Sequence, residues 1–271
     1  KGLSPGQTLL VQGTGYAEPG KAIPVTAKVL FKSRYAIVTP NAPGINVSRS
    51  IKDDDLRELL LETAHEVMND GGFGLILRSS CAGADRDEIA DDIAAMLDLA
   101  TQVMGDATGD AEKLIEGDGP HLLEWREWTD KAEIDNQDGS FERHGVLDVL
   151  DGLSGRDVPL GAQASMAVEP TRALVAVDVN TGGDTSPAAG LKANLAAVKG
   201  LPRQLRLRGL GGQVVIDLAP SPKKDRRQIE SALRAALKRD SVETTFVGWT
   251  PLGHIELQRK RDRLPLRDLL T

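Results

Sequence analysis

The residues of this chain best suited to chemistry are two aspartates, each near the end of an apolar run. Asp178 stands in the segment LVAVDVN at 174–180, and Asp217 stands in GQVVIDL at 212–218. Such β-favouring runs predict strands buried on both faces, where an ionised carboxylate would be costly. We therefore expect both carboxylates at the rim of a sheet. On adjacent strands they would lie close enough to share a hard divalent cation such as Mg²⁺, which keeps most of its waters.

Asn180 lies two positions after Asp178, so on a strand its side chain faces the same side. A neutral amide at that place could hydrogen-bond a phosphate or a water without adding charge. The residues alone leave two structural alternatives open. The carboxylates could cap turns or helices, and Asn180 could simply form a turn.

The net charge of −7 is unevenly distributed along the chain. Residues 201–271 contain 15 Lys and Arg against 8 Asp and Glu, whereas the residues before them are strongly acidic. Phosphate contacts dominate nonspecific nucleic-acid binding, so this basic segment is the predicted docking surface for a polyanion. The alternative is a set of solvated helix faces. Several of seven cations are expected to flank the metal point, and the seven are Arg203, Arg206, Arg208, Lys223, Lys224, Arg226 and Arg227.

Length and composition narrow the class of protein. At 271 residues and 40% hydrophobic, the chain is expected to be soluble and globular, with one large domain or two to three small ones. No apolar run is long enough to predict a membrane span, and no signal peptide is evident, which predicts a cytoplasmic protein. The chain begins at Lys1, which indicates a fragment or a processed product. Its one cysteine, Cys81, excludes an internal disulfide and a zinc site built on several thiolates.

Hydrophobic periodicity, with Gly and Pro punctuation, predicts alternating helices and strands. Helices are expected at about 53–70, 85–104, 188–208 and 223–239, the third broken at 200–202. Strands are expected at 7–12, 24–31, 35–39, 73–78, 164–168, 242–249 and 254–257, besides the two aspartate runs. A boundary is expected in the acidic, glycine-rich stretch 105–158. The fold class that follows is α+β, with a layered C-terminal part.

Several segments resemble a known family in their order and approximate spacing. In the C-terminal part they are 173–180, 182–184, 194–195, 203–212, 214–217 and 251–261. Together they resemble the catalytic domain of the ribonuclease E/G family. Upstream, 35–41, 48–49 and 74–79 resemble the domain of that family that senses the 5′ end of RNA. The likeness covers about 21–104 and 160–265, most of the chain.

The resemblance implies a domain organisation. A DNase I-like, layered α/β catalytic domain is expected at 159–271, preceded by a smaller α/β 5′-sensor-like domain at 21–118. Residues 1–20 would be the remnant of an upstream OB-fold domain, and 119–158 a shortened RNase H-like connecting region. The chain has no Cys-x-x-Cys pair, so the zinc-linked dimer of the larger family members is not expected. A homodimer without a zinc link stays open.

The resemblance also assigns roles to residues. It implies that Asp178 and Asp217 ligate Mg²⁺ and that Asn180 completes the catalytic set. It implies that Arg78 and Ser79 grip a terminal 5′-monophosphate, and that Ser33 and Ile37 hold other positions of that pocket. The structural alternative for Arg78 is an ordinary arginine at a strand end. The residues expected to contact the RNA backbone are Arg49, Arg203, Arg206, Arg208, Lys223 and Lys224.

Three functions follow, from different classes. The first is a Mg²⁺-dependent endoribonuclease that hydrolyses single-stranded RNA to 5′-phosphate and 3′-hydroxyl products, with stimulation by a 5′-monophosphate. The second is an RNA-binding protein of the same family with weak or no cleavage. The third is a metal-dependent phosphoesterase that acts on DNA or small molecules. The complete set of Asp178, Asn180 and Asp217 favours the endoribonuclease, since a pure binder has no need of two costly neighbouring carboxylates.

Overall fold

The structure, a computed structural model, describes residues 2–17, 20–68, 72–128 and 132–270. It divides into two compact units. The N-terminal unit comprises Lys1–Thr14 and Pro24–Ile134, and the C-terminal unit comprises Gly15–Ile23 and Asp135–Thr271. The division at 134 and 135 falls inside the stretch 105–158 where the sequence predicts a boundary. None of the helices in the described ranges is long and apolar enough to cross a membrane.

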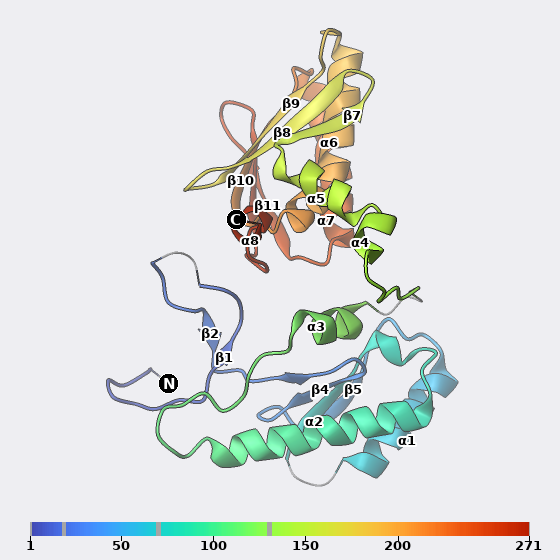
Figure 1. Cartoon of the computed structure of the whole chain (residues 1–271), viewed down its shortest axis with the longest axis vertical. Coiled ribbons are helices and arrows are strands. Elements are labelled where there is room, and N and C mark those ends of the chain that lie inside the picture. The colour runs from blue at the N-terminus through green and yellow to red at the C-terminus, as the bar shows by residue number, and fades with distance from the viewer. Residues whose placement is uncertain (1, 18–19, 69–71, 129–131, 271) are drawn as a thin grey trace. The chain divides into compact units, whose positions relative to one another are not determined.

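The N-terminal unit is built on a four-stranded sheet with two long helices against it (Figure 1). The strand order is β3 (Phe31–Lys32), β4 (Ala36–Thr39), β6 (Gly74–Leu77) and β5 (Gly44–Val47), with β5 parallel to β6 and the other pairs antiparallel. The helices are α1 (Asp54–Val67) and α2 (Arg86–Asp106), and α3 (Pro120–Glu127) follows them. The remaining elements are β1 (Gln12–Gly13), paired with β2 (Val25–Thr26), and η1 (Ser79–Cys81).

Local signals explain where these helices begin. The Asp53 carboxylate caps α1 by accepting a hydrogen bond from the Leu56 backbone N–H, and Asp85 caps α2 in the same way through Asp87. Cys81 is fully buried, and burial raises the pKa of its thiol to about 11, so it packs as a small apolar side chain. The strand expected at 7–12 is wrong in extent, because β1 comprises only Gln12–Gly13.

The C-terminal unit contains a six-stranded sheet of order β11-β12-β10-β9-β8-β7. The strands are β7 (Asp157–Gly161), β8 (Ala164–Pro170), β9 (Val175–Asn180), β10 (Gly212–Asp217), β11 (Thr244–Trp249) and β12 (Ile255–Arg259). Among the described strands of this sheet, only β9 and β10 pair in parallel, and α6 (Pro187–Leu207) joins them. The other elements are α4 (Ser140–Arg143), α5 (Val146–Ser154), η2 (Lys223–Asp225), α7 (Arg226–Arg239) and α8 (Leu266–Leu269). The predicted α+β class is confirmed.

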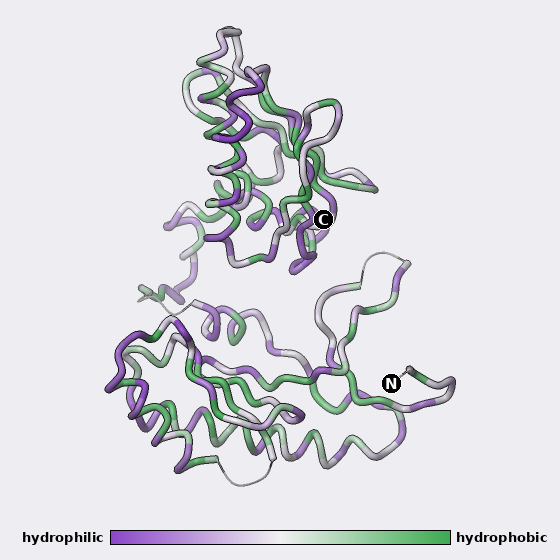
Figure 2. Tube along the Cα trace, turned by 180° about the vertical axis from the view of Figure 1, so that it is seen from behind, coloured by the Kyte–Doolittle hydropathy of each residue, from purple (hydrophilic) through white to green (hydrophobic). Residues whose placement is uncertain are grey.

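One face of this sheet carries the core and the other is open. Val177 and Ile216 are buried in a cluster that includes residues of α6 and α7, while alternate positions along β9 and β10 are exposed or half-buried. Figure 2 shows hydrophobic segments running along the strands. The expectation that these strands are buried on both faces is therefore wrong. Their apolar runs arise because alanine and valine also occupy part of the open face.

The helix predicted to break at 200–202 does not break. Pro202 lies inside the continuous helix α6, where it and Leu201 are buried. Proline removes one helical hydrogen bond, at a cost of about 3 kcal/mol in an exposed helix interior. Here the neighbouring apolar side chains of α6 pack on the sheet, which offsets that cost.

Candidate active site

Asp178 and Asp217 stand beside one another at the ends of β9 and β10. The parallel register pairs the two residues directly, and neighbouring strands lie about 4.8 Å apart. Both side chains are exposed on the open face, because they alternate with buried Val177 and Ile216. The prediction that the two aspartates occupy neighbouring strands and face the same side is confirmed.

Each carboxylate is held by one neighbour. The Asn180 amide Nδ2 donates a hydrogen bond to Oδ2 of Asp178 at 2.6 Å, so Asn180 faces the same side, as predicted. The Nδ1 atom of His254 lies 3.1 Å from Oδ1 of Asp217, and an ionised carboxylate can only accept that bond. In the described part of the chain, these contacts occupy one oxygen of each carboxylate and leave the other available to a ligand.

The donor set at this point fits a hard cation that retains water. Mg²⁺ is commonly bound through one or two carboxylates, with water in its remaining positions. Across the described ranges, no group of three or more His, Cys, Asp or Glu side chains could hold a metal ion. A cation at Asp178 and Asp217 would therefore take its further ligands from water or from a bound phosphate.

His254 is a neighbour of Asp217 that the sequence analysis did not single out. In the antiparallel register of β10 and β12, Ile216 faces Ile255, so the residue before β12 comes opposite Asp217. The hairpin fixes His254, since its N–H donates to Thr250 Oγ1 at 3.0 Å and its carbonyl accepts from Thr250 N at 2.9 Å. Only the strand register reveals this contact, and the sequence does not specify that register.

The segment after Asp217 is fixed by α6. Asn194 is fully buried, and its amide both donates to the Ala219 carbonyl and accepts from the Ala219 N–H, each at 2.9 Å. Gly190 lies one turn earlier, where a Cβ atom would come within 2.3 Å of the Pro220 carbonyl oxygen. Only glycine permits that approach. The start of α6 thus holds the loop that leaves β10.

The arginines at the end of α6 do not flank the aspartates. Because α6 runs from the end of β9 back to the start of β10, its last turn lies at the opposite end of these strands. Arg208 is only 6% exposed, donates to the Gly155 carbonyl at 3.0 Å, and has its pKa lowered by desolvation. Arg206 forms an ion pair with Asp240, and Arg203 is exposed. The prediction that several of the seven cations flank the metal point therefore does not extend to these three.

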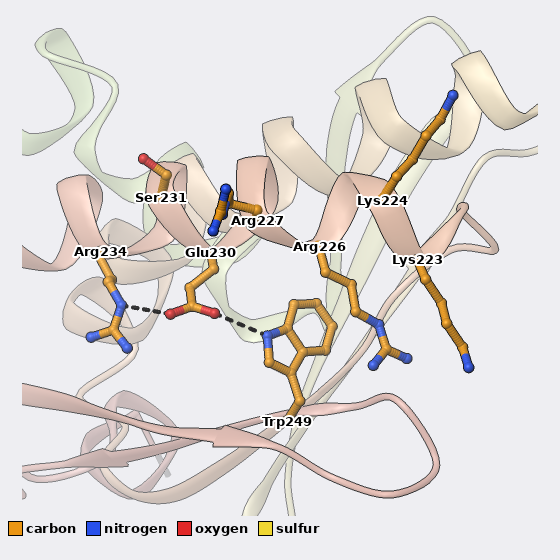
Figure 3. Close-up of a pocket in the computed structure, with 8 residues that line it drawn as sticks. All are labelled: Lys223, Lys224, Arg226, Arg227, Glu230, Ser231, Arg234 and Trp249. Carbon is orange, nitrogen blue, oxygen red and sulfur yellow. Dashed lines mark hydrogen bonds and ion pairs between the residues drawn. The ribbon is translucent and has the colours of Figure 1, made fainter.

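The cations after β10 line a shallow pocket of about 570 Å³ between η2, α7 and β11 (Figure 3). Lys223 and Lys224 are exposed at its rim. Trp249, which sequence reasoning did not single out, forms part of its wall. The complete lining is Lys223, Lys224, Arg226, Arg227, Glu230, Ser231, Arg234 and Trp249.

In the N-terminal unit, the predicted phosphate-binding residues are only partly brought together. Nη1 of Arg78 donates to the carbonyl of Ser33 at 2.6 Å, while the Ser33 hydroxyl is buried and donates to Asp92. Ile37 is half-buried on β4, and Ser79 is exposed at the start of η1. The last predicted RNA contact of this unit, Arg49, is exposed.

The Arg78 guanidinium is engaged by the chain itself. Its Nη2 donates to the Glu127 carboxylate of α3 at 3.0 Å, and Lys32 and Arg126 bind the same carboxylate at 2.7 and 3.0 Å. Burial alone would raise the pKa of Glu127, but Lys32, Arg78 and Arg126 lower the pKa below its ordinary value. A carboxylate of this chain therefore occupies the cation cluster in which a terminal phosphate was expected.

Comparison with known proteins identifies a family and several relatives that this chain resembles. The model of the ribonuclease E/G family matches residues 31–131 and 124–262. The chain is 28% identical over 310 residues to ribonuclease G of Salmonella typhimurium (strain SL1344), and equally to that of Escherichia coli (strain K12), covering 98% of this chain and 62% of each relative. It is 26% identical over 299 residues to ribonuclease E of Haemophilus influenzae, with 96% of this chain and 32% of that protein covered. The chain thus spans less than two thirds of the length of these relatives.

Proposed function

The chain belongs to the ribonuclease E/G family, and from that premise we propose that it is an endoribonuclease that hydrolyses single-stranded RNA at the Asp178–Asp217 pair. The observation that carries the proposal is the register of β9 and β10. It sets two exposed carboxylates side by side on an open sheet face, where an extended RNA strand can reach them.

We further propose that Asp178 and Asp217 hold Mg²⁺. When bound, the ion supplies neutralisation of phosphate charge and a lowered pKa for water, which are the needs of phosphodiester hydrolysis to 5′-phosphate and 3′-hydroxyl products. The chain's own residues orient the two ligands, Asn180 through Asp178 and His254 through Asp217. A cytoplasmic location and a homodimer without a zinc link remain predictions from the sequence.

Stimulation by a 5′-monophosphate is part of the proposal, with one modification. A terminal phosphate that bound Arg78 would have to displace Glu127 from Arg78 and Lys32. Phosphate dianions compete well for such a site because they carry more charge and more acceptor oxygens than a carboxylate. We expect weak stimulation in this chain and stronger stimulation when the Glu127 charge is removed.

The basic pocket of α7 alone supports a second candidate function, an RNA-binding protein with weak or no cleavage. Incubation of 5′-labelled single-stranded RNA with and without Mg²⁺ separates the two. The endoribonuclease gives internal products that require Mg²⁺ and disappear in Asp217→Asn. Asp157→Asn, an exposed aspartate of the edge strand β7, is the matched control and should cut normally. RNA that binds and stays intact would favour the second candidate.

A further inference from the structure

The pocket between η2, α7 and β11 combines five cations with an aromatic side chain. Binding of a metal ion at the aspartates does not require this combination. We propose that it is a subsite for one nucleotide of single-stranded RNA beyond the cleavage point. The phosphates on either side of that nucleotide meet the exposed cations Lys223, Lys224 and Arg227, and the base lies against the Arg226–Trp249 pair. The inference rests on the proposed endoribonuclease function and adds to it a place where the strand is held.

The pocket and the aspartate pair lie on opposite faces of the same end of the sheet. Trp249 pairs with Ile255, which in turn pairs with Ile216, and these two isoleucines face the core. His254, the preceding residue, reaches Asp217. The turn at 250–253, which joins β11 to β12, therefore lies between the pocket and the aspartate pair. A strand of RNA bound at the aspartates need only cross this turn to enter the pocket.

The charges of the pocket are largely uncompensated. Five cations line it against one acid, Glu230. That acid is already engaged, since it accepts from Arg234 Nε at 2.9 Å and from Trp249 Nε1 at 3.1 Å, and these bonds lower its pKa, Arg234 most strongly. Within the described residues, the side chains of Lys223, Lys224 and Arg227 have no hydrogen-bond or ion-pair partner. Such a group of unpaired cations favours a polyanion.

The aromatic wall distinguishes this pocket from an ordinary basic helix face. Trp249 is one of only three tryptophans in the chain, and the bond from its Nε1 to Glu230 fixes the ring (Figure 3). The Arg226 guanidinium lies 4.8 Å from the ring centroid. It also approaches Gly253, where a Cβ atom would be 2.9 Å from its Nη2. Single-strand binding proteins stack bases on aromatic rings and on guanidinium planes, so a nucleotide fits both parts of the pocket.

The test measures RNA binding without cleavage. In a chain carrying Asp217→Asn, the affinity for a 5′-hydroxyl single strand of about 12 nucleotides is followed by fluorescence anisotropy. Trp249→Ala should weaken binding by roughly 5- to 150-fold, the range for the loss of one stacked base. Trp249→Phe, which keeps a ring, should restore most of the affinity. Arg239→Ala removes an exposed cation from the same helix outside the pocket and is the matched control.

A second variant guards against a folding defect in Trp249→Ala. Arg227 is exposed, so Arg227→Ala should fold normally and should lower the salt dependence of binding by a slope of about 0.7, one phosphate contact. Polyphosphate used as a competitor should lose affinity in Arg227→Ala but not in Trp249→Ala. Equal affinity of Trp249→Ala and Arg239→Ala for RNA would overturn the proposal, as would displacement of RNA by poly-glutamate at equal charge.

The two levels of the proposal fail in different ways. Cleavage is measured separately, in the chain with Asp217 intact. If that chain binds RNA through Trp249 but never cuts it, the endoribonuclease function is wrong and the nucleotide subsite stands. If it cuts RNA, and substitution of Trp249 or Arg227 leaves the RNA affinity unchanged, the proposed subsite is wrong and the endoribonuclease function is retained.

Discussion

The aspartate pair of the C-terminal unit and the Arg78 cluster of the N-terminal unit differ in the charges that surround them. At the end of β9 and β10, two carboxylates lie side by side with an amide and an imidazole as neighbours. At Arg78, one carboxylate lies among three cations and backbone carbonyls. The first arrangement sets two like charges beside each other, whereas in the second each of the three cations contacts a carboxylate of the chain.

The aspartate pair therefore needs an external cation, whereas Arg78 already binds a carboxylate of the chain, Glu127, in place of an external anion. Unbalanced charge is costly for folding and is retained where an external ion compensates it. A cluster whose cations already contact a carboxylate holds the chain together, and an external group binds there by displacing that carboxylate. Arg78 and Asp217, although both expected to bind ligands, should therefore respond differently when their neighbours are changed.

The largest effect is expected from Asp217→Asn. Loss of one of the two charged ligands should reduce cleavage by about 1,000-fold or more, because the charge acts directly at the reacting phosphate. Binding of RNA to the basic pocket should change little. The measurement is single-turnover cleavage together with anisotropy. Cleavage at more than about a tenth of the normal rate would show that the pair is not the reaction centre.

His254→Leu should have the next largest effect. Without its hydrogen bond, the Asp217 carboxylate is free to rotate, and the loss of such a supporting contact typically costs about 10- to 100-fold in metal affinity or activity. His254→Asn, which can still donate from a position close to Nδ1, should recover part of that loss. Mn²⁺ binding followed by electron paramagnetic resonance gives a readout independent of cleavage. Equal Mn²⁺ affinity in both variants would assign His254 to packing alone.

Glu127→Gln should change the response to the 5′ end by a smaller amount. Arg78 and Lys32 would lose their internal carboxylate, so cleavage of 5′-monophosphorylated RNA should rise several-fold, while 5′-hydroxyl RNA should be cut as before. Arg78→Ala should abolish any preference between the two ends. The comparison of both substrates in all three proteins is the measurement. An unchanged ratio in Glu127→Gln would mean that Glu127 does not compete with a phosphate.

Glu127 should also make the free energy of unfolding depend slightly on pH. Its pKa in the folded chain lies below the ordinary value of 4.5, so the ionised form is the one that folding favours. The stabilisation is present at neutral pH and is lost as the pH falls through the folded pKa. Glu127→Gln should lower the free energy of unfolding by roughly 0.5–1 kcal/mol at pH 7 and by less in acid. A difference that grew in acid would contradict this assignment.

The last expected effect is on stability at the aspartate pair. Asp178→Asn removes a like-charge contact and should raise the melting temperature slightly when Mg²⁺ is absent. Added Mg²⁺ should stabilise the unaltered chain, by about 1.4 kcal/mol at ten times its dissociation constant, and should not stabilise the variant. Calorimetry at two Mg²⁺ concentrations checks both signs. Equal stabilisation of both proteins would place the ion elsewhere.

The features predictable from the sequence were those that depend on local pattern. Two apolar runs with Asp178 and Asp217 near their ends suffice to place both residues on adjacent strands at the rim of a sheet. Asn180 follows from the alternation of a strand. The caps of α1 and α2 are likewise local, since Asp53 and Asp85 each bond a backbone group within three residues.

The features that the sequence did not reveal depend on contacts between distant segments. His254 reaches Asp217 across 37 residues, and Arg78 reaches Glu127 across 49. Pro202 was expected to end a helix because proline does so in isolation, but its burial against the sheet overrides that preference. Arg208 was expected to contact the RNA backbone, yet it is buried, and the Gly155 carbonyl makes that burial tolerable.

The amide of Asn194 has a consequence for the kinetics of this protein. Because it bonds both the N–H and the carbonyl of Ala219, the segment that leaves β10 can open only when two hydrogen bonds break together. The Ala219 amide should therefore exchange with deuterated solvent as slowly as the sheet interior. The aspartates are then preorganised before an ion or RNA arrives, and association should proceed in a single step whose rate is set by encounter.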